Sequence, residues 1–161
     1  MGRGSMTDAD EELIRTARRT IERRYRPGTE ARSRSVGAAL RADSGEVYAA
    51  VNLVSDLGRA SVCAEPIALG RAVTEGEESF ETVVAVKHAP GNDARSVDAG
   101  GDDTSYRVIA PCGVCRELLR DYDPTTAAVV PGEDGLVTRS IAELLPNLVW
   151  RGSDGRRVDR D

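Results

Sequence analysis

The stretch VGAALRADSGEVYAAVN, residues 36–52, decides the fold that this sequence predicts. Its two halves, 36–42 and 46–52, are rich in small apolar and β-branched residues, as strands with a buried face are. Between them, Asp43-Ser44-Gly45 has the polar residues and the glycine that a tight turn needs. The stretch therefore predicts a β-hairpin, and the neighbouring elements determine how it is covered.

Helical periodicity lies on both sides of this hairpin. Before it, Thr7-Asp8-Ala9-Asp10-Glu11-Glu12 supplies a helix start, and apolar residues follow at helical spacing up to Arg26-Pro27-Gly28. After it, alanines recur every four residues, which predicts a second helix over about residues 62–73. Ser61 stands just before that helix and is predicted to cap it.

Strands and helices keep alternating towards the end of the chain. The remaining predicted strands lie at 80–87, 126–130 and 135–138. A third helix is expected from Cys112 to about Tyr122. The capping-box spacing of residues 140–143 predicts a last helix, which Pro146 stops.

This alternation predicts one α/β domain over residues 6–150. Residues 1–5 have the composition of an expression-tag scar, and residues 151–161 form a polar tail. Residues 89–105 are rich in proline, glycine, asparagine, aspartate and serine, so a long loop is expected there.

Composition excludes several functional classes. A net charge of -5 and only 4% aromatic residues disfavour a nucleic-acid binder, because a polyanion needs basic patches and stacking surfaces. No apolar run approaches the ~18 residues of a membrane span. Three cysteines are an odd number, so a complete disulfide framework is not expected, and a reducing cytoplasm is the expected location.

All three cysteines fall in two short motifs, Cys63-Ala64-Glu65 and Pro111-Cys112-Gly113-Val114-Cys115. A C-x-x-C at a helix N-terminus places two sulfurs near one point, where the helix dipole favours thiolates. If the helix near Cys63 faces that turn, a third thiolate joins them. Three soft ligands with one open position are typical of catalytic zinc, whereas a closed structural site has a fourth ligand, for which His88 or a carboxylate is the candidate. Buried core cysteines are the simpler alternative.

Glu65 stands two residues after a candidate ligand. Zinc lowers the pKa of its bound water to ~7, and hydrolytic deamination of an amidine-like ring also requires protons to be moved. A carboxylate near the metal but not bound to it can carry those protons. Glu65 is therefore the candidate catalytic residue, the alternative being an ordinary solvated helix charge.

The paired motifs resemble the all-cysteine zinc branch of the cytidine deaminase superfamily, and within it the blasticidin S deaminase-like cytidine deaminases. The resemblance covers most of residues 10–150. It implies a three-layer α/β/α sandwich with a mixed five-stranded sheet and helices on both faces. It also implies a homotetramer, or a homodimer, with active sites near the subunit interfaces.

The resemblance also implies roles for individual residues. Substrate-binding positions match Asn52, Ala64, Ala110 and Trp150. Asn52 is alternatively a turn residue at a strand end, and Trp150 a core residue. Arg116 follows Cys115 directly, so its guanidinium is expected to balance the thiolates from outside the ligand set, or else to pair with Glu117 or Asp121 on the surface.

Three departures from the family pattern bear on the substrate. Val54 stands where a ribose-binding glutamate is usual, Arg34 and Ser35 stand where an aromatic residue packs on the base, and Pro66 replaces an arginine. The predicted function is zinc-dependent hydrolytic deamination of a cytosine-type nucleoside or analogue, such as cytidine, deoxycytidine or a blasticidin S-like compound, with release of ammonia. The alternatives are deamination of another amino-heterocycle, such as a purine or small base, and a non-catalytic zinc or nucleoside-binding protein of the same fold.

Overall fold

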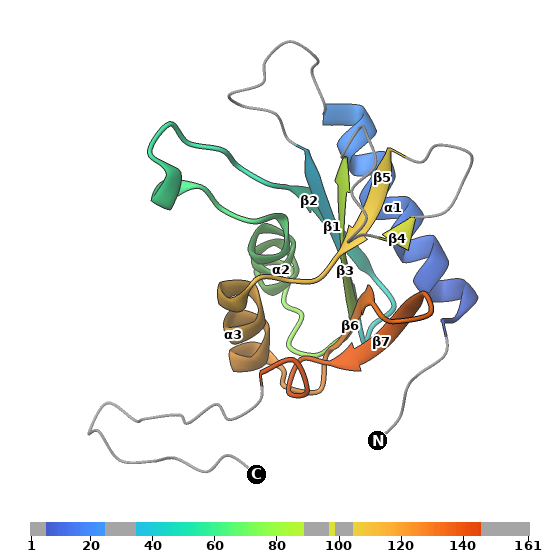
Figure 1. The fold of residues 1–161 in the computed structure, drawn as a ribbon. Helices are drawn as coiled ribbons and strands as arrows, with labels where there is room; N and C mark the ends of the chain where they lie inside the picture. The colour runs from blue at the N-terminus through green and yellow to red at the C-terminus, as the bar shows by residue number, and fades with distance from the viewer. Residues whose placement is uncertain (1–5, 25–34, 89–96, 99–104, 146–161) are drawn as a thin grey trace.

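The computed structural model describes residues 6–24, 35–88, 97–98 and 105–145 (Figure 1). The helices of this part are α1 (Asp8–Arg24), α2 (Ala64–Thr74), α3 (Gly113–Tyr122) and the short 3-10 turn η2 (Gly58–Ala60). The strands are β1 (Val36–Ala42), β2 (Val47–Val51), β3 (Phe80–His88), β4 (Val97–Asp98), β5 (Tyr106–Ile109), β6 (Ala127–Pro131) and β7 (Leu136–Ser140).

Strand β3 organises the sheet. One of its edges pairs with β1, which continues antiparallel into β2 as the hairpin motif predicts. Its other edge is shared, because residues 82–84 pair with β6 in parallel while residues 85–88 pair with β5 antiparallel. Strands β4 and β7 extend the two branches at their outer edges. The sheet is therefore mixed, as expected.

Alternating side chains of the strands separate two cores. On β1, Ala38 and Leu40 belong to the cluster under α2 and α3, whereas Ala39 belongs to the cluster under α1. Helix α1 contributes Leu13 and Ile21 to its side of the sheet. Figure 1 shows α1 on one face and α2 with α3 on the other. The predicted α/β/α layering is confirmed.

A glycine sets the distance between α1 and the sheet. A Cβ atom at Gly37 would lie 2.5 Å from the carbonyl oxygen of Ala17 and 2.8 Å from Cγ1 of Ile21. Because real Cβ atoms do not approach so closely, a side chain at this position would push the helix away from β1.

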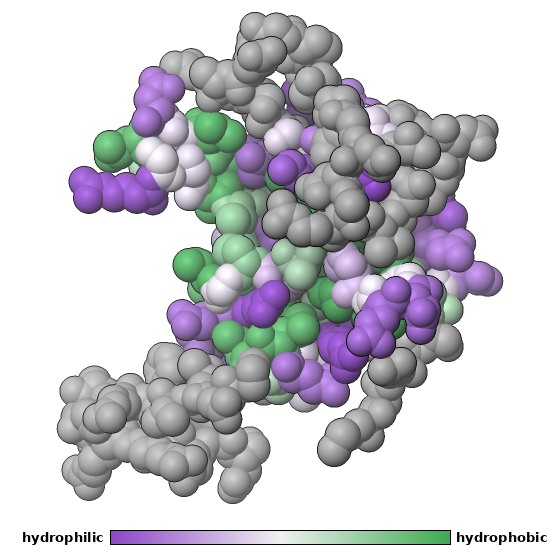
Figure 2. All heavy atoms as spheres, in the orientation of Figure 1, coloured by the Kyte–Doolittle hydropathy of each residue, from purple (hydrophilic) through white to green (hydrophobic). Residues whose placement is uncertain are grey.

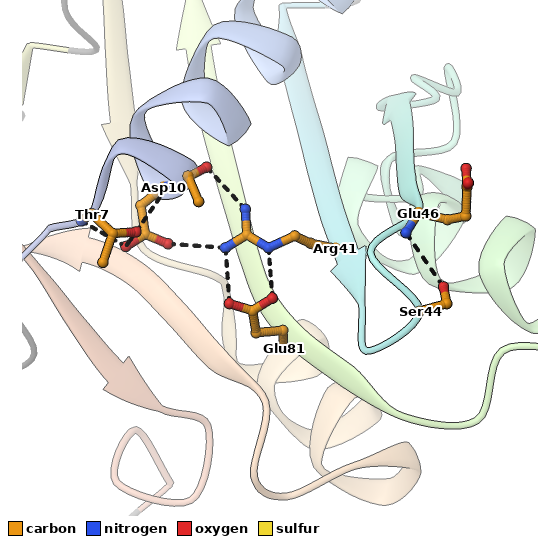
Figure 3. A network of polar contacts seen from close by, with 7 residues as sticks. Thr7, Asp10, Arg41, Ser44, Glu46 and Glu81 are labelled. Carbon is orange, nitrogen blue, oxygen red and sulfur yellow. Dashed lines mark hydrogen bonds and ion pairs between the residues drawn. The ribbon is translucent and has the colours of Figure 1, made fainter.

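A polar network fastens the start of α1 (Figure 3). Thr7 Oγ1 accepts from the Asp10 N–H at 3.2 Å, and the Asp10 carboxylate accepts from the Thr7 N–H at 3.0 Å, which is the reciprocal arrangement of a capping box. Arg41 of β1 donates to the carbonyl oxygen of Ala9 at 2.9 Å and reaches both carboxylate oxygens of Glu81 at 2.8 and 3.2 Å. The sheet thus determines where the helix begins.

Several boundaries differ from the sequence predictions. The described part of the sheet has seven strands, because β5 and the two-residue β4 join the five that the pattern predicts. Strand β4 lies inside the stretch expected to be one long loop. Residues 141–145 form turns where a last helix is predicted, although Glu143 and Ser140 make the capping-box hydrogen bonds at 2.9 and 3.2 Å.

None of the helices in the described ranges combines the length and the apolar character that a bilayer crossing requires.

Candidate metal centre and substrate cavity

Two helix N-termini bring the three cysteines together. Cys63 is the N-cap residue of α2, Cys112 is the N-cap residue of α3, and Cys115 lies in the first turn of α3. Both N-cap residues have extended backbone, so each thiol leaves the chain where a helix begins. Cys115 is buried, while Cys63 and Cys112 remain exposed. The sequence motifs therefore converge as predicted.

The sulfur geometry fits a zinc ion. The Sγ atoms of Cys63 and Cys112 are 3.7 Å apart, those of Cys112 and Cys115 are 3.3 Å apart, and all three lie within 4.8 Å of one another. Tetrahedral zinc with Zn–S distances of ~2.3 Å separates its sulfurs by about 3.8 Å. Three sulfur donors at this spacing are a donor set that zinc prefers.

His88 is not part of this cluster. It ends β3, and its ring lies against the ring of Tyr106 with the centroids 4.9 Å apart. Within the described ranges, the metal-ligand cluster consists of three cysteines. The alternative of a closed structural site with His88 as fourth ligand is therefore wrong for this structure.

The electrostatics of the three thiols differ. Burial raises the pKa of Cys63 and, more strongly, that of Cys115. Burial also acts on Cys112, but the backbone N–H of Cys115 and the neighbouring thiols outweigh it and lower the pKa of Cys112. A thiol loses its proton when it binds a metal ion. A divalent cation here would therefore be bound by three thiolates, and its positive charge would offset their negative charge.

Glu65 lies beside the thiols in the first turn of α2. Its side chain is 3% exposed, and burial raises the pKa of its carboxyl group. Pro66 follows within the same turn, where the missing N–H costs nothing because that position has no helical partner. The alternative of a solvated helix charge does not hold for Glu65.

A cavity of about 180 Å³ opens in front of Glu65 and the thiols. Its lining residues come from β1, the segments that follow β2 and precede α2, the first turn of α2, and the end of β5 with its link to α3. They are Val36, Asn52, Leu53, Ser61, Val62, Cys63, Glu65, Ile109, Ala110 and Cys112. The structure therefore brings candidate ligands, the candidate catalytic acid and two candidate substrate contacts, Asn52 and Ala110, to one place.

Asn52 has a structural role as well as a place in this cavity. Its Oδ1 accepts from the Val36 N–H at 3.1 Å, and its backbone N–H donates to the Val36 carbonyl oxygen at 3.0 Å. These hydrogen bonds fix the side chain at the end of β2. Because Oδ1 already accepts this hydrogen bond, the amide NH₂ group is the part of the side chain left to donate to a ligand.

The other predicted site residues are placed differently. Ala64 is fully buried in the core under α2 and is not a cavity-lining residue. Arg116 donates from Nε to the Pro111 carbonyl oxygen at 2.7 Å and from Nη1 to the Leu144 carbonyl oxygen at 3.0 Å. Its guanidinium thus contacts backbone next to Cys112. Trp150 and Arg34 lie outside the described residues.

Arg116 was also a candidate for surface ion pairs along its own helix. Among the ion pairs of the described side chains, none joins Arg116 to Glu117 or to Asp121. The guanidinium is instead used between two backbone segments, as its hydrogen bonds show.

Sequence reasoning missed one polar residue of the cavity. Ser61 is predicted to cap α2, but the N-cap residue is Cys63, and no side chain caps that helix. Ser61 instead lines the cavity. Its position two residues before Cys63 is a weak indication that it lines the site, because side chains two residues apart in an extended chain point to the same side.

The fold and the thiol cluster together define a zinc-binding α/β protein, and comparison with known proteins identifies the class. Residues 7–130 match the family described as "Cytidine and deoxycytidylate deaminase zinc-binding region". The chain belongs to this family. The predictions of a deaminase-family domain and of zinc as its cofactor are therefore confirmed.

Similar proteins agree with this assignment. The chain is 38% identical over 142 residues to "Blasticidin-S deaminase" of Bacillus cereus, a match that covers 88% of this chain and 93% of the relative. A crystal structure of cytidine deaminase from Burkholderia pseudomallei has a TM-score of 0.63 at 27% identity, covering 88% of this chain and 98% of that one. The cytidine deaminase from Bacillus anthracis, at 19% identity and a TM-score of 0.64 over 86% of this chain and 87% of that one, shows the shared fold.

Proposed function

We propose that this chain catalyses hydrolytic deamination of a cytosine-type nucleoside or nucleoside analogue. The observation that carries the proposal is the single cavity that joins Cys63 and Cys112 to Glu65, Asn52 and Ala110. The relatives named blasticidin-S deaminase and cytidine deaminase support the same substrate class.

The side chains divide the work of the reaction. Cys63, Cys112 and Cys115 would hold zinc, which supplies Lewis-acid activation of water at neutral pH. Glu65, buried beside them, takes a proton from the attacking water and gives it to the ring nitrogen. It then takes the second proton of that water, from the oxygen now bonded to the ring carbon, and gives it to the departing amine, which leaves as ammonia with the electron pair of the broken C–N bond. The Ala110 carbonyl oxygen and the Asn52 amide orient the substrate from the cavity wall.

Ammonia release from a panel of aminated heterocycles tests this proposal. Cytidine, deoxycytidine, blasticidin S, cytosine and adenosine would be compared with the zinc-loaded chain. Turnover of at least one cytosine-type nucleoside is expected, and it should fall by a factor of 10²–10⁴ in Glu65→Gln with the zinc content unchanged. Glu75→Gln, at the opposite end of the same helix, is the matched control and should keep full activity.

Two results would contradict the proposal. Full turnover by Glu65→Gln would remove the role given to this carboxylate. Nucleoside binding without turnover of any compound in the panel would favour the non-catalytic alternative, and turnover confined to adenosine would favour a purine deaminase.

We also propose that the chain acts as one domain, as a homotetramer or homodimer in the cytoplasm, on a small molecule rather than on a nucleic acid. The family resemblance supports the assembly, and the net charge of -5 disfavours a polyanionic partner. Light scattering of the zinc-loaded chain measures the assembly, and a monomer at micromolar concentration would contradict it.

A further inference from the structure

The segment between Asn52 and Cys63 is a hairpin closed at its base. Leu53 and Val62 form an antiparallel bridge in which each N–H donates to the other's carbonyl oxygen at 2.9 Å. The hairpin projects from the body of the molecule (Figure 1), and Figure 2 shows hydrophobic surface on it. Leu53 is 52% exposed and Leu57 58% exposed. Leu53, at the base of the hairpin, therefore both lines the cavity and contacts the solvent.

Ser61 lies at this base and takes part in two arrangements. Its Oγ accepts from the Ser55 N–H at 3.1 Å, across the hairpin. It also lines the cavity, together with Leu53 and Val62 on the same hairpin. The hydrogen bond to Ser55 explains why the hydroxyl is held in place although it caps no helix.

The hydrogen bond to Ser55 determines what Ser61 can offer a ligand. A hydroxyl has one proton and two acceptor lone pairs, so a hydroxyl whose oxygen already accepts from one donor still has its proton to give. Asn52 is in the same position, because its Oδ1 accepts from Val36 and its NH₂ group is left to donate. Both side chains can therefore present donors to the cavity, between the apolar walls of Val36 and Ile109.

Depth in the cavity indicates which part of a ligand meets these donors. Among the lining residues with a proposed catalytic role, Glu65 is only 3% exposed, so the carbon that loses its amine must reach the end of the cavity where Glu65 lies. In a cytosine ring the amine-bearing carbon and the substituted ring nitrogen lie opposite each other. The substituent of a nucleoside therefore points to the outer end, where Ser61 and Leu53 are exposed.

We propose that Ser61 is a specificity-determining residue that donates its hydroxyl proton to an oxygen of the nucleoside's sugar and so contributes to the discrimination between a nucleoside and its free base. The proposal rests on the function proposed above. It adds a residue that distinguishes the two ligands, because a base without an oxygen-bearing substituent has no acceptor for this donor.

Binding to the zinc-loaded full chain in a Glu65→Gln background tests the proposal without turnover. Isothermal titration gives dissociation constants for cytidine and for cytosine. Adding Ser61→Ala should weaken cytidine binding about three- to tenfold, the effect of one hydrogen bond, and leave cytosine binding unchanged. Ser61→Thr retains a hydroxyl and should restore the preference for cytidine.

Ser55→Ala is the matched control. It removes the Ser55 Oγ that accepts from the Leu57 N–H at 3.2 Å, but it keeps the Ser55 N–H that binds Ser61. The ratio of the two dissociation constants should therefore stay at its original value. Zinc content and melting temperature, measured on each variant, detect a merely structural effect.

Two outcomes would overturn the proposal. They are an unchanged dissociation constant for cytidine in Ser61→Ala, and equal weakening of cytidine and cytosine. Failure of the proposed function is recognised separately, as absence of ammonia release by the protein with Glu65 intact.

Discussion

Arg116 connects the zinc turn to the chain that follows β7. Its guanidinium holds the Pro111 carbonyl next to Cys112 and the Leu144 carbonyl at the same time. Since groups behind a metal ligand orient it, Arg116→Ala should release zinc to a chelating dye about tenfold faster. Arg116→Lys replaces the planar guanidinium with a single ammonium group, so its rate of zinc release should lie between the rates of the alanine variant and the original protein.

Arg120, one turn further along α3, provides the comparison for this experiment. Arg120→Ala should leave the rate of zinc release as it is. An unchanged rate in Arg116→Ala would show that the two carbonyl contacts do not support the metal centre.

Gly37 and Gly70 predict opposite effects of the same substitution. Gly37→Ala places a Cβ 2.5 Å from the Ala17 carbonyl oxygen and should lower the free energy of unfolding by about 1–3 kcal/mol. A Cβ at Gly70, inside α2, meets nothing within 4 Å, so Gly70→Ala should raise the free energy of unfolding by about 0.5–1 kcal/mol. Urea unfolding measures both, and a tolerated Gly37→Ala would mean that α1 can move away from β1.

At the scale of elements, Asp123 joins the end of α3 to the start of β3. Its carboxylate accepts from the Phe80 N–H at 2.9 Å and from Thr125 through the N–H at 2.9 Å and the hydroxyl at 2.6 Å. Burial by itself would raise the pKa of Asp123, but these hydrogen bonds outweigh it and lower the pKa below its ordinary value.

This lowered pKa predicts the direction of an acid effect. The charged carboxylate stabilises the fold above the unfolded-state pKa of about 4, and that stability is lost as the pH falls through the lower pKa of the folded state. Asp123→Asn should therefore unfold at lower urea concentration at pH 7, and its difference from the original protein should shrink below about pH 4. A difference in urea midpoint that stays the same at all pH values would contradict this prediction. Asp121→Asn, at an exposed position, is the control.

The parts of the site that the sequence predicts are those set by local geometry. A C-x-x-C at a helix N-terminus determines its own sulfur spacing, and Glu65 has a constant offset from Cys63. The partners of Ser61 and Arg116 are instead backbone groups brought near by tertiary structure, which no spacing in the chain encodes. The prediction of Ser61 as a helix cap is therefore wrong, as is the alternative of Arg116 in a surface ion pair, whereas the role of Arg116 beside the thiolates stays a prediction.

The same reasoning applies to the secondary structure. The five predicted strands have β-prone runs of their own, whereas β4 is two residues in a polar stretch that pairs with the edge of β5. At residues 140–143 the capping box forms its hydrogen bonds, yet the described residues after it stay in turns. A cap lowers the cost of starting a helix but does not supply the turns that continue it.

On the scale of the whole molecule, the metal centre joins two helices that share one face of the sheet. Because Cys63 belongs to α2 and Cys112 and Cys115 to α3, an ion bound here connects segments far apart in the chain. Free zinc at a hundred times its dissociation constant adds about 2.7 kcal/mol to the stability of the fold. Removal by a chelator should therefore lower the melting temperature.

Cys63→Ser separates this effect from any other action of the chelator. The variant should melt below the zinc-loaded protein, and the chelator should shift its melting temperature by less. Complete removal of zinc with no change in melting temperature would show that the ion does not connect the two helices energetically.

The closed base of the hairpin between Asn52 and Cys63 separates the tip of the hairpin from the cavity. Residues at the tip of the hairpin can change in number or kind while the Leu53–Val62 bridge keeps its two ends in register. A library built over Gly58–Ala60 would therefore vary the tip of the hairpin while Leu53 and Val62 keep their places in the cavity wall. Loop grafting at this tip would give the protein a new surface and leave the lining of the cavity as it is.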